Sequence, residues 1–323
     1  MSEPIARAEL IEDRGEAASG GEFFRSRPFL DAEGVTHTLR IAAADAELLA
    51  PLIVREIDGS AERDAISPYG YPGIVDASDI DHARVGPMSD ALLAPAAIEF
   101  STVGLVTVFL RHTLGDPPLS GATERNVVQI ADPALPQKSR GSDRNQINKN
   151  LRRGYELQLV PGPETTAPQR AGFLAAYEQT MRRTGAGERY FFAAAYFDRI
   201  LESAQTWLAL ALAPGGGIAA ASIAARSDGY LHYYLSGSAD SHLRDSPMKN
   251  VVASLVELSA ELALPLNLGG GIARGDRLEE FKRGFANREL PWLASEVVCD
   301  AAAYARLSEG REAGGFFPAY RAS

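Results

Sequence analysis

The clearest hydrophobic pattern lies between residues 207 and 235, where short glycine-containing turns separate three apolar stretches. Residues 207–213, 218–226 and 230–235 each have the length of a strand. The sequences PGGG and SDG between them are typical of turns that join antiparallel strands. Because a three-stranded meander buries little apolar surface on its own, the pattern also predicts helices packed against it.

Helical patterns flank this meander on both sides. Residues 142–154, 169–184 and 193–204 precede it and predict helices, the first of them followed by a strand over residues 155–160. After the meander, Ser246 and Pro247 form a helix start, and apolar residues continue at helical spacing to Leu262. A strand over residues 264–268 follows. The order is therefore helix, helix, meander, helix, strand, helix, strand.

The first half of the chain is a mixture of strands and helices with less regular spacing. It predicts strands over residues 36–41, 52–57, 102–112 and 126–130, and a helix over residues 89–99. The stretch DAISPYGYPGIVD, residues 64–76, is dense in Pro, Gly and Tyr and predicts a loop of definite shape. This content is enough for a small domain of its own.

The segment NLGGGIARGDRLEEFKRGF, residues 267–285, leads from a strand through three glycines into a short helix. Asp276 and Glu279 have capping-box spacing, and Gly284 follows the expected last turn. Lys282 complements the helix dipole there. Two interpretations are open from these residues alone: a well-capped surface helix, or a backbone that approaches a ligand through its glycines.

Composition indicates a globular protein with more than one domain. The 323 residues suit two domains, and no stretch approaches the roughly 20 apolar residues that span a bilayer. Residues 1–20 have acidic side chains and no apolar core, so they predict a disordered lead-in and not a secretory signal. The single cysteine, Cys299, excludes an internal disulfide. We therefore expect a cytoplasmic protein without integral membrane contact. The five histidines are scattered, so we expect no metal site.

Charge is unevenly distributed on an acidic chain of formal net charge -10. That balance argues against general nucleic-acid affinity. Residues 137–153, QKSRGSDRNQINKNLRR, nevertheless hold six basic residues and one acid. The segment is either a candidate phosphate-binding surface or a solvated helix face. The candidate RNA contacts within it are Arg144, Lys149, Arg152 and Arg153.

Four segments resemble one family in the correct order: SDRNQINKNLRRGYEL, YEQTMRRTGAGERYFFAAAYFDRIL, YLHYYLSGSADSHLRDSP and LNLGGGIARGDRLEEFKRGF. They resemble the FemABX-type aminoacyl- and peptidyltransferases, strongly from Asp143 onward and weakly before it. The resemblance implies an α/β (α+β) protein with two GNAT-like acyltransferase domains, whose mixed central sheets are flanked by helices. The expected division is a lead-in 1–20, an N-terminal domain 21–141, a C-terminal domain 142–308 and a tail 309–323.

The resemblance also implies a reaction, the transfer of an aminoacyl group from aminoacyl-tRNA to an amine to form an amide. The catalytic Phe-Lys pair of the family falls on Phe281 and Lys282. Lys282 would stabilise the oxyanion and the leaving 3′ oxygen, because a tetrahedral intermediate needs positive charge or donors aimed at it. Tyr234 is the third catalytic candidate. The acceptor would be a small-molecule metabolite or a peptidoglycan precursor.

Other residues are candidates for binding the substrate. They are Tyr69, Tyr71, His232, Tyr233, Gly269, Gly270 and Gly271. Each has a structural alternative, since a histidine in a strand and aromatic residues in loops frequently only pack. The segment HLRDSPMKN has no glycine and places Pro247 where a coenzyme A pyrophosphate would need an amide. We therefore expect no bound cofactor, with aminoacyl-tRNA as co-substrate; acyl-CoA is the alternative donor, and a non-catalytic binding protein is the third possibility.

Overall fold

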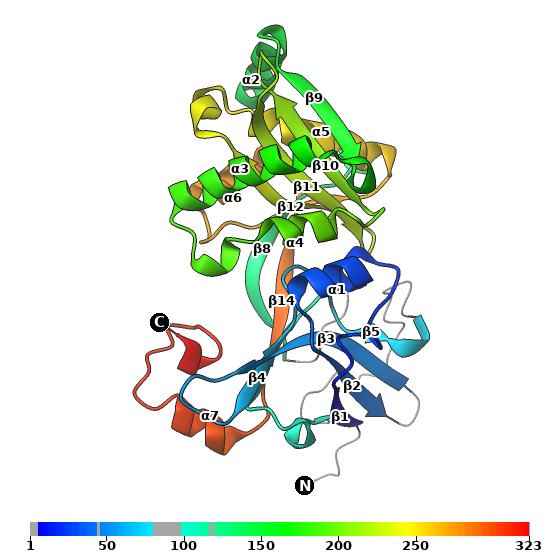
Figure 1. Cartoon of the computed structure of the whole chain (residues 1–323), viewed down its shortest axis with the longest axis vertical. Helices are drawn as coiled ribbons and strands as arrows, with labels where there is room; N and C mark the ends of the chain where they lie inside the picture. Colours follow the sequence, from blue (N-terminus) through cyan, green and yellow to red (C-terminus); the bar gives the residue numbers. More distant parts are fainter. Residues whose placement is uncertain (1–5, 44–45, 80–97, 116–118, 120, 323) are drawn as a thin grey trace. The chain divides into compact units, whose positions relative to one another are not determined.

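The computed structural model describes residues 6–43, 46–79, 98–115, 119 and 121–322 (Figure 1). Contacts between residues divide the chain into two compact units. Unit 1 comprises residues 1–125 and 291–323, and unit 2 comprises residues 126–290. This division differs from the expected boundary at residues 141/142. The physical reason is strand pairing, because the end of β8 (Thr123–Ala131) pairs with β13 of unit 2 and the end of β14 (Arg288–Val298) pairs with β7 of unit 1.

Unit 1 is built on a sheet with the strand order β6-β1-β2-β3-β4-β7-β14, in which β5 also pairs with β3. The pairs β1/β6 and β4/β7 are parallel, and the others with a described register are antiparallel. The elements are β1 (Ala6–Ile11), α1 (Arg27–Glu33), β2 (His37–Ala43), β3 (Ala46–Glu56), β4 (Arg63–Ile66), β5 (Val75–Asp76), β6 (Ile98–Glu99), β7 (Thr107–Arg111) and α7 (Ala301–Leu307). Most of the helix expected over residues 89–99 lies outside the described residues.

Two expectations for unit 1 were wrong. The predicted disordered lead-in contains β1, because Ala6 and Ala8 alternate inward and the strand pairs with β2 over five residues. The end of the chain is not a separate tail, because Tyr320 is buried and Arg321 binds the fully buried carboxylate of Asp64. Short or weakly apolar segments are ordered here by long-range pairing.

Unit 2 is built on a sheet with the strand order β8-β13-β12-β11-β10-β9. The β12/β13 pair is parallel and the other pairs are antiparallel, so this sheet is also mixed. The elements are α2 (Gly141–Arg152), β9 (Glu156–Pro161), α3 (Ala167–Thr184), α4 (Ala194–Ile200), β10 (Thr206–Leu212), β11 (Ile218–Ser227), β12 (Tyr230–Ser238), α5 (Met248–Glu261), β13 (Leu266–Gly269) and α6 (Arg277–Arg283). The predicted meander is confirmed as β10, β11 and β12.

Helices cover both faces of this sheet, with α3 in front of the strands and α5 behind them in Figure 1. The core on the α5 face includes Val252 and Leu255 of the helix and Leu231 and Leu266 of the strands. On the other face, the rings of Phe173, Tyr177 and Phe197 pack together between α3 and α4. The expected mixed sheets flanked by helices are confirmed. Among the described residues, no helix is long and apolar enough to span a bilayer.

Candidate active site

The sheet of unit 2 divides between its two parallel strands. β12 and β13 pair only at Leu231 with Leu266 and at His232 with Asn267, although β12 continues to Ser238. A bulge in β12 follows, because Ala224 pairs with Tyr233 while Ile223 pairs with Leu235. Bulges re-aim side chains and are common next to active sites. The end of β13, where the glycines begin, therefore lies at the opening of the sheet.

Lys282 lies on α6, directly after this opening. The residue is 8% exposed, and its Nζ donates a hydrogen bond of 2.6 Å to the carbonyl oxygen of Gly270. Burial lowers the pKa of Lys282 to about 8, because a charged amine is poorly solvated in the interior, and the carboxylate of Asp276 opposes this shift. The result is a fixed amine that changes charge near neutral pH.

The three glycines allow the backbone to pass closely around Lys282. Gly269 has a φ of +75°, and a Cβ built there would lie 3.1 Å from the Nζ of Lys282. A Cβ on Gly270 would lie 2.6 Å from the carbonyl oxygen of Val127. The Nδ2 of Asn126 donates to the carbonyl oxygen of Gly271 at 2.9 Å. The immediate role of the glycines is thus to let the backbone turn against β8 and the lysine; their binding of substrate stays a prediction.

The start of α6 is fixed by the predicted cap. The carboxylate of Asp276 accepts the Glu279 N–H at 2.7 Å, and Glu279 accepts the Gly275 N–H at 2.8 Å. Hydrogen bonds to its carboxylate lower the pKa of Asp276, so it stays ionised. The capping interpretation of Asp276 is confirmed, and it makes Asp276 the nearby negative charge that Lys282 experiences.

Phe281 anchors α6 from the neighbouring position. Its ring contacts that of Phe285 edge to face with centroids 5.7 Å apart, and both belong to the α5-side core. Gly284 closes the helix, as predicted, and a Cβ there would lie 2.8 Å from the carboxylate of Asp143. Phe281 therefore fixes the rotation of the helix that carries Lys282; its contact with a substrate remains a prediction.

His232 is fully enclosed and neutral. Burial lowers its pKa to about 4, and its ring nitrogens lie 3.2 Å from the carbonyl oxygen of Ser227 and 3.1 Å from the Nδ2 of Asn267. Since a carbonyl only accepts, Nε2 carries the proton, and Nδ1 accepts from Asn267. These contacts favour a structural role for His232 over direct substrate binding.

The two tyrosines of β12 have different surroundings. Burial raises the pKa of Tyr233 to about 12, so its phenol stays protonated, and its side chain packs against the α5-side core. Tyr234, the residue at the bulge, places its hydroxyl 2.9 Å from that of Tyr196 on α4. Tyr234 therefore faces α4, and its catalytic role stays a prediction.

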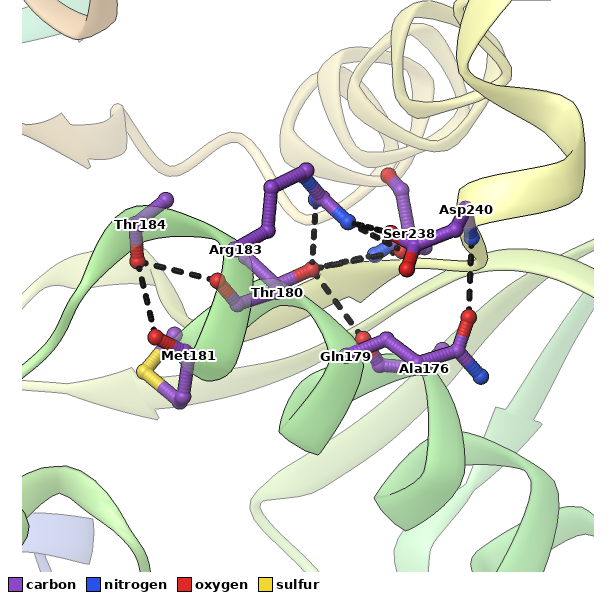
Figure 2. Close-up of polar contacts among 8 residues, drawn as sticks. All are labelled: Ala176, Gln179, Thr180, Met181, Arg183, Thr184, Ser238 and Asp240. Carbon is purple, nitrogen blue, oxygen red and sulfur yellow. Dashed lines mark hydrogen bonds and ion pairs between the residues drawn. The ribbon is translucent and has the colours of Figure 1, made fainter.

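Figure 2 shows how α3 holds the far end of β12. The Thr180 hydroxyl accepts the Ser238 N–H at 2.9 Å and donates to the carbonyl oxygen of Ala176 at 3.0 Å. Arg183 forms an ion pair with Asp240, whose N–H donates to the side chain of Gln179 at 2.8 Å. The motif YEQTMRR therefore ties β12 to its helix and fixes where the following loop begins.

That following loop carries an acidic residue, Asp245, that α2 and the residues between α2 and β9 hold in place. The carboxylate of Asp245 binds Arg153 at 2.6 Å and accepts the Tyr155 hydroxyl at 2.9 Å. Its carbonyl oxygen accepts the side-chain amides of Gln146 and Asn150. Burial and this carboxylate raise the pKa of Tyr155 to about 12.

The start of α5 differs from the prediction. Ser246 does not cap the helix; it has a φ of +49°, and α5 begins at Met248 after Pro247. The Nζ of Lys249 binds the carboxylate of Asp143 at 2.8 Å. An acidic side chain, Asp245, therefore precedes α5, and the lysine near the start of the helix is neutralised.

The basic segment forms helix α2, with a polar inner face and a basic outer face. Asp143 points inward to Lys249, and Asn150 is fully buried against Asn250, with the two side chains 2.7 Å apart. The predicted RNA-contacting residues are all exposed: Arg144, Lys149, Arg152 and Arg153. Arg144 donates to the carbonyl of Ser139, and Arg153 is paired with Asp245 as described.

Tyr69 and Tyr71 belong to unit 1, in the predicted Pro-Gly loop. The N–H of Tyr69 donates to Glu33 at 2.7 Å, and Arg111 lies 5.4 Å from the centre of its ring. The ring of Tyr71 contacts that of Trp292 edge to face, with centroids 6.3 Å apart. Both rings are half-buried within this cluster of unit 1.

Neither a metal cluster nor a disulfide partner emerges from the described residues. None of their groupings of His, Cys, Asp and Glu is suited to hold a metal ion. Burial raises the pKa of the Cys299 thiol to about 12, so it is an unreactive packing residue.

Comparison with known proteins places the fold. Residues 137–283, from α2 through Lys282, match the family described as Acetyltransferase (GNAT) domain. The structure of FemX covers 83% of this chain and 90% of its own, with a TM-score of 0.55 and 10% identity. The chain has a FemABX-like GNAT fold. L-PGS from Bacillus licheniformis has a TM-score of 0.50 at 12% identity, covering 83% of this chain and 86% of its own. No curated sequence matches the chain.

The fold predicted from the family resemblance is confirmed, and the GNAT domain match supports an acyltransferase. The roles of individual residues stay predictions. Two residues of the site escaped sequence reasoning, Asn267 and Asp245. Asn267 is the only polar side chain in the apolar stretch LPLNLG, and a lone polar residue in a buried strand is a usable signal. Asp245 gave no such signal, because acidic residues are common in loops.

Proposed function

We propose that the protein is an aminoacyltransferase that passes an aminoacyl group from aminoacyl-tRNA to an amine and forms an amide. The observation that carries this proposal is the buried ammonium of Lys282 at the opening between β12 and β13. Its low exposure strengthens its interaction with a developing negative charge, since water does not screen it. The GNAT domain match, which includes Lys282, supports acyl transfer as the reaction class.

In the proposed reaction a neutral amine attacks the ester carbonyl and produces a tetrahedral oxyanion. The Lys282 ammonium donates to this oxyanion and to the 3′ oxygen as the ester bond breaks. At pH 7 a group with a pKa of about 8 is roughly ten to one protonated, so most molecules carry the charge. The attacking nitrogen loses one proton and the departing ribose oxygen gains one, which leaves the overall charge unchanged.

The surroundings of α5 support a donor other than coenzyme A. A diphosphate bound at this helix start would meet the Asp245 carboxylate, while Arg153 and Lys249 are already neutralised by Asp245 and Asp143. Pro247 has no N–H to offer there. The exposed Lys149 and Arg152 of α2 offer positive charge to an RNA backbone instead.

A second candidate is an acyl-CoA-dependent N-acyltransferase, which the GNAT domain match favours. A donor screen separates the two. Purified protein is incubated with an amine panel and either total tRNA charged with radiolabelled amino acids or a panel of acyl-CoAs. We expect label to enter the amine only from charged tRNA, and to be lost after ribonuclease treatment. Transfer that resists ribonuclease and needs acyl-CoA would establish the second candidate instead; a Lys282→Met protein controls for uncatalysed transfer.

The acceptor is proposed from chemistry alone: a primary or secondary amine on a small metabolite or a peptidoglycan precursor. A product that a mass spectrometer identifies as the acceptor plus one aminoacyl group would establish the amide. If no amine accepts label from any donor, the third possibility, a binding protein on the same fold, gains support.

A further inference from the structure

A chain of buried polar groups in unit 2 connects β12, through β13, to the backbone that holds Lys282. His232 on β12 donates from Nε2 to Ser227 and accepts at Nδ1 from Asn267. Asn267 on β13 is 1% exposed, and its Oδ1 accepts the N–H of Gly269 at 2.8 Å. One residue later, the carbonyl of Gly270 accepts the Lys282 ammonium at 2.6 Å.

The amide nitrogen and the amide oxygen of Asn267 each have a hydrogen-bond partner, His232 and Gly269 respectively. A neutral imidazole with its proton on Nε2 can only accept at Nδ1, so the amide must present its NH2 to His232 and its oxygen to Gly269. His232 therefore fixes the orientation of the amide, and the amide fixes the direction of the Gly269 N–H. Both residues are enclosed, so water does not compete for these bonds.

The backbone turn at Gly269 links the fixed Gly269 N–H to the position of the Lys282 side chain. Gly269 has a left-handed backbone conformation, with a φ of +75°. In this conformation its Cα faces the Nζ of Lys282, and the Gly270 carbonyl points toward the same atom. Without the Asn267 oxygen, the Gly269 N–H would be left without this acceptor, and a glycine has many other conformations available.

We propose that Asn267 is a positioning residue for Lys282, which holds the turn at Gly269 so that the Gly270 carbonyl fixes the ammonium at the opening of the sheet. The proposal rests on the proposed function for its effect on catalysis, although the coupling between Asn267 and Lys282 is a property of the folded protein alone. His232 acts one step further away, by orienting Asn267.

The charged groups around Lys282 are few and mostly paired. The carboxylate of Asp276 is the one whose charge raises its pKa. On its own helix Glu279 is paired with Arg283, and next to Gly284 the Asp143 carboxylate is paired with Lys249. A change in the pKa of Lys282 after substitution of Asn267 therefore reflects the solvation of the ammonium and the charge of the new side chain.

Direct titration of Lys282 tests the coupling without any assay of activity. The chain has only four lysines, Lys138, Lys149, Lys249 and Lys282, so selective 13C labelling of lysine gives four Cε signals, and Lys282→Met assigns one of them. In Asn267→Ala we expect the pKa of Lys282 to rise by about one unit, because a loosened turn admits water to the ammonium. Asn287→Ala is the matched control, since Asn287 also bridges two backbone groups, at Asp132, and should leave this signal unchanged.

Asn267→Asp is the second variant, of nearly the same shape and with the acceptor for Gly269 retained. Its carboxylate should also raise the pKa of Lys282, by about one unit or more. A folded Asn267→Ala protein in which Lys282 titrates as in the wild type would overturn the proposal.

Kinetics then separate positioning from simple loss of structure. In Asn267→Ala we expect kcat to fall by about 10- to 100-fold with KM for the donor nearly unchanged. In Asn267→Asp the alkaline limb of the pH profile should move upward with the pKa of Lys282. If instead Lys282→Met keeps full activity, the proposed function fails, and the titration still decides whether Asn267 and Lys282 are coupled.

Discussion

Lys282 and Gly270 are joined by a hydrogen bond of 2.6 Å from an ammonium to a backbone carbonyl in a nearly dry environment. Such a site is costly for the folded protein. The ammonium has lost most of its hydration and has gained one neutral acceptor and the more distant charge of Asp276. Burial of this kind is typical of a residue retained for chemistry, although structural ion pairs also perturb pKa values.

Lys282→Met should therefore increase stability while it abolishes activity. The pKa of Lys282 is lowered to about 8, so the protonated side chain disfavours the folded state by up to about 3 kcal/mol below pH 8. The penalty disappears as pH rises toward the unfolded pKa of about 10.4, where the amine is neutral in both states. Thermal unfolding of both proteins between pH 6.5 and 10 should show the variant ahead at low pH and the difference shrinking with pH. Transfer should fall about 100-fold or more.

The activity of the wild-type protein should decline above about pH 8. A lysine that stabilises an oxyanion must be protonated, and Lys282 loses its proton in this range because burial has lowered its pKa. The measurement is kcat/KM for the donor, at saturating amine, between about pH 6 and 10.5. An alkaline limb that appears only near pH 10 would mean that Lys282 titrates like an ordinary surface lysine.

Gly269→Ala should damage the site more than its backbone strain alone explains. The new Cβ would lie 3.1 Å from the Nζ of Lys282, so the ammonium must move away from Gly270. Gly275 is the matched control in the same segment, since its φ is +77° and a Cβ there has open space. Both variants should lose about 1 kcal/mol of stability, but only Gly269→Ala should lose activity, by about 10-fold or more. Equal activities in the two proteins would separate Gly269 from the function of Lys282.

Much of unit 2 could be predicted from the sequence, because its signals are local. The meander has turns and strand-length apolar runs, α3 has a Thr166–Gln169 capping box, and α6 begins where Asp276 predicts. The fold class followed from the order of these elements together with the family resemblance of the four segments. The position of Lys282 on a short capped helix was likewise readable from the segment itself.

The remainder depends on contacts between distant residues. β1 has small alternating residues and exists because β2 pairs with it, and Asp245 acquires its role from Arg153 and Tyr155, about 90 residues earlier. Asn267 becomes meaningful only once β12 places His232 beside it. Local patterns carry no information about such partners, so the sequence did not predict that the glycines pack against β8 and Lys282.

The end of the chain should be essential for the stability of unit 1. Arg321 binds both oxygens of Asp64, at 2.5 and 3.0 Å, and that carboxylate is fully buried. Arg321→Ala leaves Asp64 with Arg55 as its remaining cation, which should lower the free energy of unfolding by about 3 kcal/mol. Arg306→Ala, which breaks an exposed pair with Glu62, should cost less than about 1 kcal/mol. Chemical denaturation of the three proteins measures both values, and a similar loss in both variants would contradict the anchoring role of Arg321.

Charge reversal on α2 should weaken RNA binding without changing the fold. Lys149 and Arg152 are exposed on the outer face of the helix, while Asn150 faces inward, so Lys149→Glu with Arg152→Glu alters only the surface. If the phosphate backbone of tRNA lies there, removing two contacts should reduce the slope of log Kd against log salt by about 1.5 to 2. Arg226→Glu, a charge reversal at an exposed residue on β11, is the control for a reversal elsewhere on the surface and should leave the slope unchanged. Fluorescence anisotropy with labelled tRNA from 50 to 300 mM salt gives both slopes. Identical slopes for the α2 double variant and the control would mean that α2 is a solvated helix that does not bind RNA. An acyl-CoA would then be the donor to test first in the screen.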